Sequence, residues 1–338
     1  MALRQWRQGG VALVVFFIAS SAVTGAAPPG PTDSTSVDSC TTIDMPGEYV
    51  VTEDLSADGT CLTITADDVT LDGAGHELSG NGTGTGVVVG GENVTVRNVT
   101  ATGFDAGADL DGQNSSVVES TFSANRVGVT VTTPRNATLS NNTVVGNAGD
   151  GVNVLLGSVT LDGNRLADNG GYGLATAPGE ATTLIDNVVE NNSKGGLLFA
   201  SGTPTLRDNQ VRDNGGDGVF LDEVSGATLA NNTVTGNDGV GLAVAESTDV
   251  GLFATNLSNN AGDGIRVAGT LDVSNSTITD NGGDGIHALT AQLVEATDVT
   301  VSDTVIERNA GDAVGGPAAG NVTVVDGPNA NAADGLSR

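Results

Sequence analysis

A histidine and an aspartate lie three residues apart near the C-terminal end of the sequence. The stretch GGDGIH spans residues 282–287 and contains Asp284 and His287. A carboxylate beside an imidazole could transfer protons in general acid–base catalysis. Strand alternation, however, would place residues 284 and 286 on one face of a strand and His287 on the other. Asp284 and His287 are therefore weak catalytic candidates, and the sequence assigns no stronger one.

Aspartates recur at one position, three residues after an Asn that itself recurs along the chain, at Asp150, Asp217, Asp263, Asp284 and Asp312. The last three fall on successive repeats. Carboxylates stacked about 4.8 Å apart repel one another unless a cation or concentrated salt screens them, and calcium accepts such oxygen ligands. We expect no cofactor to be required, and Asp263, Asp284 and Asp312 are candidate calcium ligands. The alternative is that these aspartates are turn residues exposed to solvent.

Aromatic residues make up only 3% of the chain, so stacking of sugar rings on exposed aromatic side chains has few candidates. Tyr172 occupies the position that holds Asp in other repeats and is the candidate for ligand stacking. Phe199 and Phe220 lie in strand-like runs, and we expect both of them in the core.

These candidates belong to a repeat of about 22 residues. Two columns of Asn recur with that spacing, and a fixed period of this length predicts a repeat architecture. The first column contains Asn125, Asn147, Asn169, Asn192, Asn214, Asn237, Asn260, Asn281 and Asn309. The second contains Asn142, Asn164, Asn187, Asn209 and Asn232. In stacked coils, an inward-pointing Asn can bond to the Asn of the next coil, so we expect a structural Asn ladder.

Within each repeat, apolar and polar residues alternate over short runs such as GVNVL, which is the periodicity of β-strands. Asn, Gly and Asp separate the runs, and these residues tolerate the left-handed backbone of sharp bends. The pattern predicts an all-β fold, a single-stranded right-handed parallel β-helix of about twelve coils. The leucine-rich repeat is the alternative, because VTLDGNRLADN (159–169) fits its pattern. Its helical return arm is disfavoured here by Gly and β-branched residues.

Apolar residues also form columns, which should stack into a continuous core. Val144, Leu166, Val189 and Val211 belong to one column and are expected to touch in sequence through the interior. Burial of each such side chain is worth roughly 1.5–3 kcal/mol. A single coil has no partner for either of its edges, so stability should arise only from stacking.

The N-terminal segment, residues 1–27, is predicted to be a signal peptide. Arg4 and Arg7 precede the apolar stretch VALVVFFIASSAV, and small residues surround Ala26 and Ala27, where cleavage is expected. An uncleaved anchor is the alternative. Residues 28–39 are predicted to form a flexible linker. Residues 40–325 should form the β-helix, with 40–80 as its N-terminal cap and first coil, and residues 326–338 a polar tail.

Cys40 and Cys61 are the only cysteines. In an exported protein, an isolated pair most often forms a structural disulfide. Closing a loop of about 20 residues could contribute roughly 3 kcal/mol to stability. A redox or metal-binding pair is less favoured, because the C-x-x-C spacing is absent.

The chain carries 41 acidic and 12 basic residues, for a formal net charge of −29. This balance excludes nucleic acid as an expected partner, since nucleic-acid binding demands a basic face. A single lysine, Lys194, with abundant Asp is typical of proteins from extreme halophiles, in which salt screens the self-repulsion. The alternative is an acidic coat that serves solubility alone.

Eleven Asn-x-Ser/Thr sequons occur, at Asn81, Asn93, Asn98, Asn114, Asn136, Asn141, Asn191, Asn231, Asn256, Asn275 and Asn321. In an exported protein these are candidate glycan acceptors. The ladder pattern NNT generates sequons by itself, and an Asn that points inward cannot carry a glycan. We therefore expect at most a few of them to be used.

Residues 39–80, SCTTIDMPGEYVVTEDLSADGTCLTITADDVTLDGAGHELSG, contain a Cys pair, a PGEYV turn and an LDGxGH element. This segment resembles the start of right-handed parallel β-helix proteins of the NosD-like or CASH (carbohydrate-binding and sugar hydrolase) type, as found among exported haloarchaeal members. The resemblance covers residues 40–325 and implies an exported protein that handles polysaccharide or acts at the cell surface. Copper chemistry is not expected, because His76, His287, Met45 and the paired cysteines do not cluster. His76 is interpreted as a structural residue.

The sequence therefore favours a secreted or cell-surface module, monomeric, with a structural or glycan-binding role and a polysaccharide or cell-surface glycoprotein as partner. The alternative is a polysaccharide-active enzyme, either a lyase or a glycoside hydrolase. A lyase of this fold needs a basic residue beside a carboxylate-bound calcium ion. Its candidates are Lys194, Arg207, Arg212 and Arg266, for which the sequence indicates no cluster. The two carboxylates that hydrolysis requires can arise by chance in so acidic a solenoid, so an enzyme is less favoured.

Overall fold

The computed structural model describes residues 34–133, 136–177, 181–294 and 296–326. The predicted signal peptide and most of the predicted polar tail lie outside the described residues. The described residues form one compact unit. Among the described residues, no helix has the length and apolar character needed to cross a membrane.

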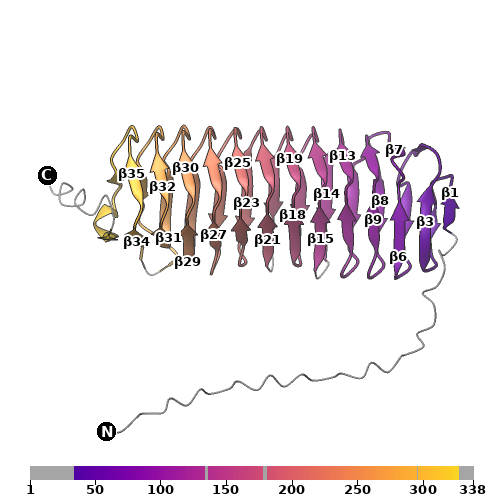
Figure 1. Ribbon diagram of the computed structural model, residues 1–338, viewed down its shortest axis with the longest axis horizontal. Helices are drawn as coiled ribbons and strands as arrows, with labels where there is room; N and C mark the ends of the chain where they lie inside the picture. Colours follow the sequence, from indigo (N-terminus) through magenta and orange to yellow (C-terminus); the bar gives the residue numbers. More distant parts are fainter. Residues whose placement is uncertain (1–33, 134–135, 178–180, 295, 327–338) are drawn as a thin grey trace, which may run out of the picture. The chain divides into compact units, whose positions relative to one another are not determined.

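The chain winds into a right-handed parallel β-helix, a rod of stacked coils (Figure 1). Each full coil contributes one strand to each of three faces, which we name face 1, face 2 and face 3 in chain order. Every strand pairs in parallel with its equivalents in the neighbouring coils.

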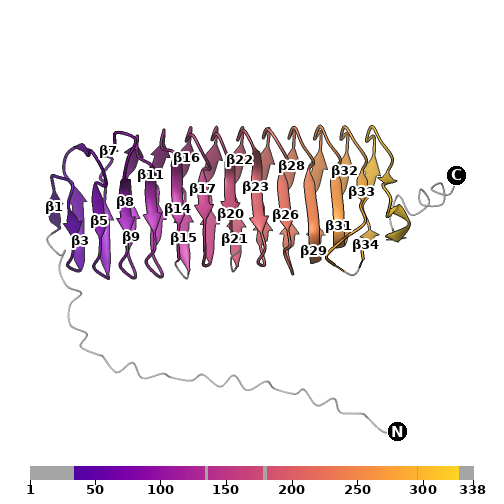
Figure 2. The same ribbon diagram turned by 180° about the vertical axis from the view of Figure 1, so that it is seen from behind.

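Face 1, most of whose strands are among those labelled in Figure 2, consists of β2 (Thr42–Ile43), β5 (Leu62–Ile64), β8 (Thr85–Val89), β11 (Ala106–Leu110), β14 (Val127–Val131), β17 (Val152–Val154), β20 (Tyr172–Thr176), β23 (Gly195–Ala200), β26 (Val219–Asp222), the first parts of β29 (Leu242–Phe253) and β31 (Ile265–Ser274), β33 (Ile286–Ala288) and β36 (Val314–Gly315). Face 2 consists of β1 (Thr35–Val37), β3 (Gly47–Val51), β6 (Val69–Asp72), β9 (Thr95–Arg97), β12 (Ser116–Val118), β15 (Ala137–Ser140), β18 (Val159–Asp162), β21 (Thr182–Ile185), β24 (Thr205–Arg207), β27 (Thr228–Ala230), the last parts of β29 and β31, β34 (Asp298–Ser302) and β37 (Val322–Asp326).

Face 3 is a 12-stranded sheet made of β4 (Leu55–Ser56), β7 (Glu77–Ser79), β10 (Thr100–Thr102), β13 (Thr121–Ser123), β16 (Thr143–Val145), β19 (Arg165–Ala167), β22 (Val188–Glu190), β25 (Gln210–Arg212), β28 (Thr233–Thr235), β30 (Asn256–Ser258), β32 (Thr277–Thr279) and β35 (Val305–Glu307). A single 3₁₀ turn, η1 (Ala319–Asn321), precedes β37. The return segments are strands, which confirms the β-helix and excludes the leucine-rich repeat.

The interior is a set of stacked apolar columns. Val144 is in register with Leu166, Leu166 with Val189, and Val189 with Val211, and each is at most 1% exposed. The predicted core column therefore exists with the predicted members. At about 25 cal/mol per Å² of apolar area removed from water, such columns are the main source of stability in a fold without a globular core.

The two Asn columns form two buried hydrogen-bonded ladders at two of the three bends. In the ladder from Asn142 to Asn232, the Nδ2 of Asn142 donates to Oδ1 of Asn164 at 3.0 Å and to the Val117 carbonyl at 2.8 Å. The same two bonds recur at Asn164, Asn187 and Asn209. Each amide thereby satisfies backbone groups that a sharp buried bend would otherwise leave unpaired.

Glycine is required where a ladder amide of one coil lies against the backbone of the coil before it. A Cβ at Gly264 would lie 2.9 Å from Nδ2 of Asn281 and 2.8 Å from the Gly285 carbonyl. Any larger residue there would separate the coils, which explains the Gly that follows the Asp in motifs such as GGDG.

The N-terminal end begins earlier than the sequence predicted. Strand β1 lies in the segment predicted to be a linker, and Thr35–Val37 pair with Tyr49–Val51 of β3 because their alternation matches that strand. Cys40 and Cys61 form the expected disulfide. Nδ1 of His76 lies 3.2 Å from Oδ1 of Asp54, which also accepts the backbone N–H of Glu77.

Candidate functional site on face 1

One outward-facing column on face 1 changes character along the rod. Its members follow one another in strict register from β17 to β33, so they lie in a row with a spacing of about 4.8 Å. The row reads Asn153, Ala175, Leu198, Phe220, Ala243, Arg266 and His287. Apolar side chains in the middle thus give way to a guanidinium and an imidazole at the C-terminal end.

Two successive coils build the same local pair at that end. Asp263 Oδ2 accepts hydrogen bonds from Nε and Nη2 of Arg266, at 3.1 and 2.9 Å. One coil later, Oδ2 of Asp284 lies 2.6 Å from Nδ1 of His287. In both coils the acid lies at the bend and its partner lies three residues later on the strand. The two pairs are adjacent because Arg266 is in register with His287.

The other oxygen of each Asp fastens the coils together. Oδ1 of Asp263 accepts the backbone N–H of Asp284 at 2.8 Å, and Oδ1 of Asp284 accepts that of Asp312 at 2.7 Å. A Cβ at Gly315 would lie 2.1 Å from Oδ2 of Asp284. The carboxylate of Asp284 therefore extends over the coil that follows, where the missing side chain leaves room for it.

The expectation that Asp284 and His287 diverge is wrong. Strand β33 begins only at Ile286, so Asp284 belongs to the bend, and the alternation argument does not apply to it. The bend turns the Asp284 carboxylate toward the outward-facing imidazole. Nε2 of His287 forms no hydrogen bond with the described residues, and the side chain is 29% exposed.

The predicted calcium ligands are brought together only in part. The ligand atoms of Asp263, Asp284 and His287 lie within 4.8 Å of one another. Asp312 is exposed and contacts this group by donating its backbone N–H to Asp284. Oδ2 of Asp263 is already bonded to Arg266, whose charge would lie beside any cation at that oxygen. The two carboxylates are therefore better suited to positioning Arg266 and His287 than to binding calcium.

The apolar part of the row adjoins Tyr172, four coils before Asp263 in the bend column. The Tyr172 ring lies over Gly195, where a Cβ would be only 2.9 Å from the ring. Nζ of Lys194 lies 5.9 Å from the ring centroid. Burial, together with the nearby charges of Asp217 and Asp150, raises the pKa of the Tyr172 hydroxyl. The ring is thus a partly exposed platform that stays neutral at ordinary pH.

Phe220 is not a core residue, contrary to expectation. Phe199 is 1% exposed and lies inside, in register with Leu221, whereas Phe220 pairs with Leu198 and faces outward, half-buried. We call the set Tyr172, Leu198, Phe220, Arg266 and His287 the face-1 strip. It extends over about 24 Å at the usual coil spacing.

The other basic candidates lie elsewhere. Arg212 of β25 and Arg165 of β19 both bind Glu190 on face 3, where the carboxylate side chain is 8% exposed. Arg207 is exposed on face 2. Of the four basic candidates, Arg266 therefore belongs to the face-1 strip and Lys194 adjoins it, and only Arg266 converges with an acid–base pair.

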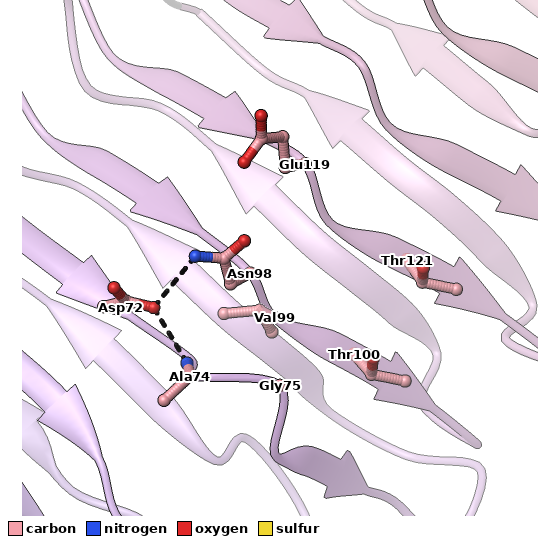
Figure 3. Close-up of a pocket in the computed structure, with 8 residues that line it drawn as sticks. All are labelled: Asp72, Ala74, Gly75, Asn98, Val99, Thr100, Glu119 and Thr121. Carbon is pink, nitrogen blue, oxygen red and sulfur yellow. Dashed lines mark hydrogen bonds between the residues drawn. The ribbon is translucent and has the colours of Figure 1, made fainter.

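A hollow of about 460 Å³ lies near the N-terminal end, where face 2 bends into face 3 (Figure 3). Asp72 of the LDGAGH element points into it. Its Oδ1 accepts from the Ala74 backbone and Asn98 Nδ2, and its Oδ2 from Arg97. Burial would raise the pKa of Asp72, but these hydrogen bonds and the Arg97 charge lower it overall. Both oxygens are satisfied, so Asp72 holds the bend and is not available to a ligand.

The sequence matches the model of the family described as right handed beta helix region over residues 59–211, 158–292 and 200–327. Together these matches span most of the chain, so the protein belongs to this family. No curated protein sequence matches.

Solved structures share the fold at low sequence identity. The A-module of mannuronan C-5 epimerase AlgE4 from Azotobacter vinelandii is 18% identical, with a TM-score of 0.64, and the match covers 84% of this chain and 91% of that one. The periplasmic alginate epimerase AlgG is 16% identical, with a TM-score of 0.63 and coverages of 83% and 78%. The catalytic unit of a GH87 α-1,3-glucanase from Streptomyces thermodiastaticus is 17% identical, with a TM-score of 0.55 and coverages of 85% and 70%.

Two features of the face-1 strip were not predicted from the sequence. One is the outward-facing neighbours Leu198 and Phe220, and the other is the pairing of Arg266 with Asp263. The signal for the first was available, because the register of 22 to 23 residues aligns Phe220 with Leu198 and not with Phe199. The signal for the second was the repeated spacing Asp-x-x-Arg and Asp-x-x-His one coil apart.

Proposed function

We propose that this protein is an exported β-helix that binds a polysaccharide along the face-1 strip. The observation that carries the proposal is the row itself. Half-buried Phe220 and Leu198 offer an apolar surface for sugar rings, and the Asp-supported Arg266 and His287 offer fixed donors in register with it. Apolar faces combined with a few oriented polar groups are how proteins recognise sugars.

Export is supported by the Cys40–Cys61 disulfide, which forms in oxidising compartments. Polysaccharide as ligand is supported by the neighbours, whose names describe action on alginate and α-glucan. An acidic polysaccharide suits the cationic end of the strip, because a guanidinium binds a carboxylate with two parallel hydrogen bonds. The wider surface is strongly acidic, so concentrated salt should be needed to screen its repulsion of the ligand.

The test is calorimetric titration of the mature protein, at high salt, with uronate-rich and neutral oligosaccharides. Phe220→Ala and Arg266→Ala should each weaken binding at least tenfold. Arg207→Ala removes one exposed charge on face 2 and serves as the matched control, with affinity unchanged. Equal losses in Arg266→Ala and Arg207→Ala, or no binding of either sugar class, would contradict the proposal. Repeating the titration with calcium and with chelator tests whether a cation takes part.

Catalysis is a second candidate, which the 2.6 Å contact between His287 and Asp284 favours. Such a pair orients the imidazole so that Nε2 can accept a proton, while Arg266 could neutralise a substrate carboxylate. Removal of the proton next to a uronate carboxylate leads either to elimination or to epimerisation. Incubation with uronate polymers in deuterated buffer distinguishes this candidate. His287→Ala should abolish deuterium incorporation and ultraviolet-absorbing products, and their absence in the wild type would leave binding alone.

A further inference from the structure

Several sequons lie at bends, and their three positions have different environments. The second residue of the sequon is a buried ladder residue in three sequons at the bend from face 2 to face 3. These second residues are Asn142, Asn232 and Ser276, which are 2%, 2% and 3% exposed. The first residue of each sequon, which would accept a glycan, is exposed. These acceptors, which we call the edge sequons, are Asn141, Asn231 and Asn275.

The bend conformation turns each acceptor outward. Asn141, Asn231 and Asn275 have φ values of 54°, 56° and 49°, a left-handed conformation that Asn adopts at low cost. The third residue of each sequon is Thr143, Thr233 or Thr277, which begins a strand of face 3 and also faces outward. Acceptor amide and Thr hydroxyl therefore lie outside the coil while the residue between them is buried.

The acceptor side chains differ from those of four other sequons in their hydrogen bonds. Among the described residues, the side-chain amides of Asn141, Asn231 and Asn275 form no hydrogen bond. Each is tied to the next coil only through its backbone N–H. By contrast, Asn98 occupies the same bend column, and its Nδ2 donates to Asp72 at 3.1 Å. The amides of Asn81, Asn93 and Asn136 are likewise engaged, with Asp58, Asp68 and Asn114.

We propose that Asn141, Asn231 and Asn275 are sites of N-linked glycosylation, which rests on the proposed export of the chain. The amide nitrogen of Asn forms a bond to the anomeric carbon of an oligosaccharide carried on a lipid phosphate or diphosphate. The bond from that carbon to the phosphate oxygen breaks, the lipid phosphate leaves, and the amide proton passes to the transferase. The first two sites lie four coils apart and the last two lie two coils apart, about 19 and 10 Å.

The position of this edge gives the glycans a defined place. In a closed coil of three strands, the bend between face 2 and face 3 is the corner opposite face 1. Glycans there would cover one edge of the rod and leave the face-1 strip exposed. Glycosylation and sugar binding would then occupy different sides of the same molecule. Asn191 has an exposed acceptor at the other ladder bend, between face 3 and face 1, so a glycan there would border face 1.

The test is mass spectrometry of the full chain after production in a host that exports and N-glycosylates proteins. Thr143→Ala, Thr233→Ala and Thr277→Ala each remove one sequon without changing the bend. Each should lower the mass by one glycan, and glycopeptides should map to the three acceptors. Thr100→Ala, which removes the Asn98 sequon, is the matched control and should leave the mass unchanged.

A mature chain that has lost residues 1–27 and carries no glycan would overturn the glycosylation proposal while leaving export intact. A chain that keeps these residues and carries no glycan would overturn both. Glycans confined to Asn98 or the other engaged amides would also overturn it. Sugar binding by the face-1 strip is measured separately, on the unglycosylated protein. A failure of the sugar-binding proposal can therefore be distinguished from a failure of the glycosylation proposal.

Discussion

Two ionic clusters on this rod use the same kinds of side chain to opposite effect. On face 3, Arg165 and Arg212 approach Glu190 from the coils on either side, and the carboxylate is buried between them. On face 1, Asp263 and Asp284 lie at the base of the cluster, and Arg266 and His287 extend beyond them. In the first cluster the acid is enclosed by the bases. In the second, each acid holds a single base, and the two bases continue the apolar row of face 1, so the second cluster is the better placed to meet a ligand.

The largest effect is expected from Glu190→Gln, which leaves two guanidiniums facing each other without a carboxylate between them. Loss of a partner from a fully buried pair costs about 3–5 kcal/mol. The two arginines here are 43% and 42% exposed, so solvent screening reduces the expected loss to about 2 kcal/mol. Chemical unfolding at high salt measures it, and polysaccharide binding should not change. A loss of binding in this variant would show that the two clusters are not independent.

Asp263→Asn should have the opposite result, a small loss of stability and a clear loss of binding. The amide oxygen can still accept the Asp284 backbone N–H, but its NH₂ group cannot accept from Arg266. Since Arg266 is 46% exposed, the free energy of unfolding should fall by less than about 1 kcal/mol. Affinity for uronate oligosaccharides should fall about tenfold, because Arg266 is no longer held in place. A variant that unfolds readily but binds normally would make the face-1 cluster a structural one like that on face 3.

The segment that follows His287 forms a pH-dependent contact with β29. Glu246 of β29 accepts the backbone N–H groups of Gln292, Leu293 and Val294, at distances of 2.6 to 3.3 Å. These bonds, that of Leu293 foremost, lower the pKa of Glu246. Because the pKa is lowered in the folded state, this contact stabilises the protein fully at pH values above about 4.3, the pKa of Glu in the unfolded chain. The stabilisation is lost as the pH falls through the pKa of Glu246 in the folded protein.

Thermal unfolding of the wild type and Glu246→Gln across pH checks this contact. The wild type should be the more stable at neutral pH, and the difference should disappear at acidic pH. A difference that persists unchanged at low pH would show that the contact does not depend on the charge of Glu246.

The smallest effect is expected from Asp109→Asn on the N-terminal part of face 1. Asp109 has no cationic partner among the described residues, and burial raises its pKa although the Thr132 hydroxyl donates to it at 2.8 Å. A raised pKa means that the charged form is penalised, so wild-type stability should fall as pH rises through the folded value. The variant should therefore melt slightly higher at neutral pH, with no gain at acidic pH. A lower melting temperature at neutral pH would mean that the charge itself is needed.

Most of the fold could be predicted from the sequence because the period is almost constant. The ladder from Asn142 to Asn232 and the core column from Val144 to Val211 needed only alignment of repeats, since stacking converts equal spacing into contact. The alignment also contained the information that Phe220 faces outward. That residue was misplaced because a shift of one position reverses the face of every side chain in a strand.

The site was less accessible, because it depends on bends. Asp284 lies outside the strand that carries His287, so periodicity says nothing about the direction of its carboxylate. Glu190 and Arg165 are 25 residues apart, which is not the repeat spacing, so their diagonal contact across coils could not be found by aligning columns. Long side chains reach between columns, and only the structure determines which of their neighbours they contact.

The Asn ladder has a consequence for how this molecule can change in length. Each ladder amide donates forward to the next coil and accepts from the coil before it, always in the same direction. Any coil in this run can therefore replace any other without leaving an unpaired amide. Gain or loss of one entire repeat preserves the bonds of this ladder, whereas a partial repeat breaks them. The rod can thus evolve by duplication and deletion of whole turns, with the ladder kept intact.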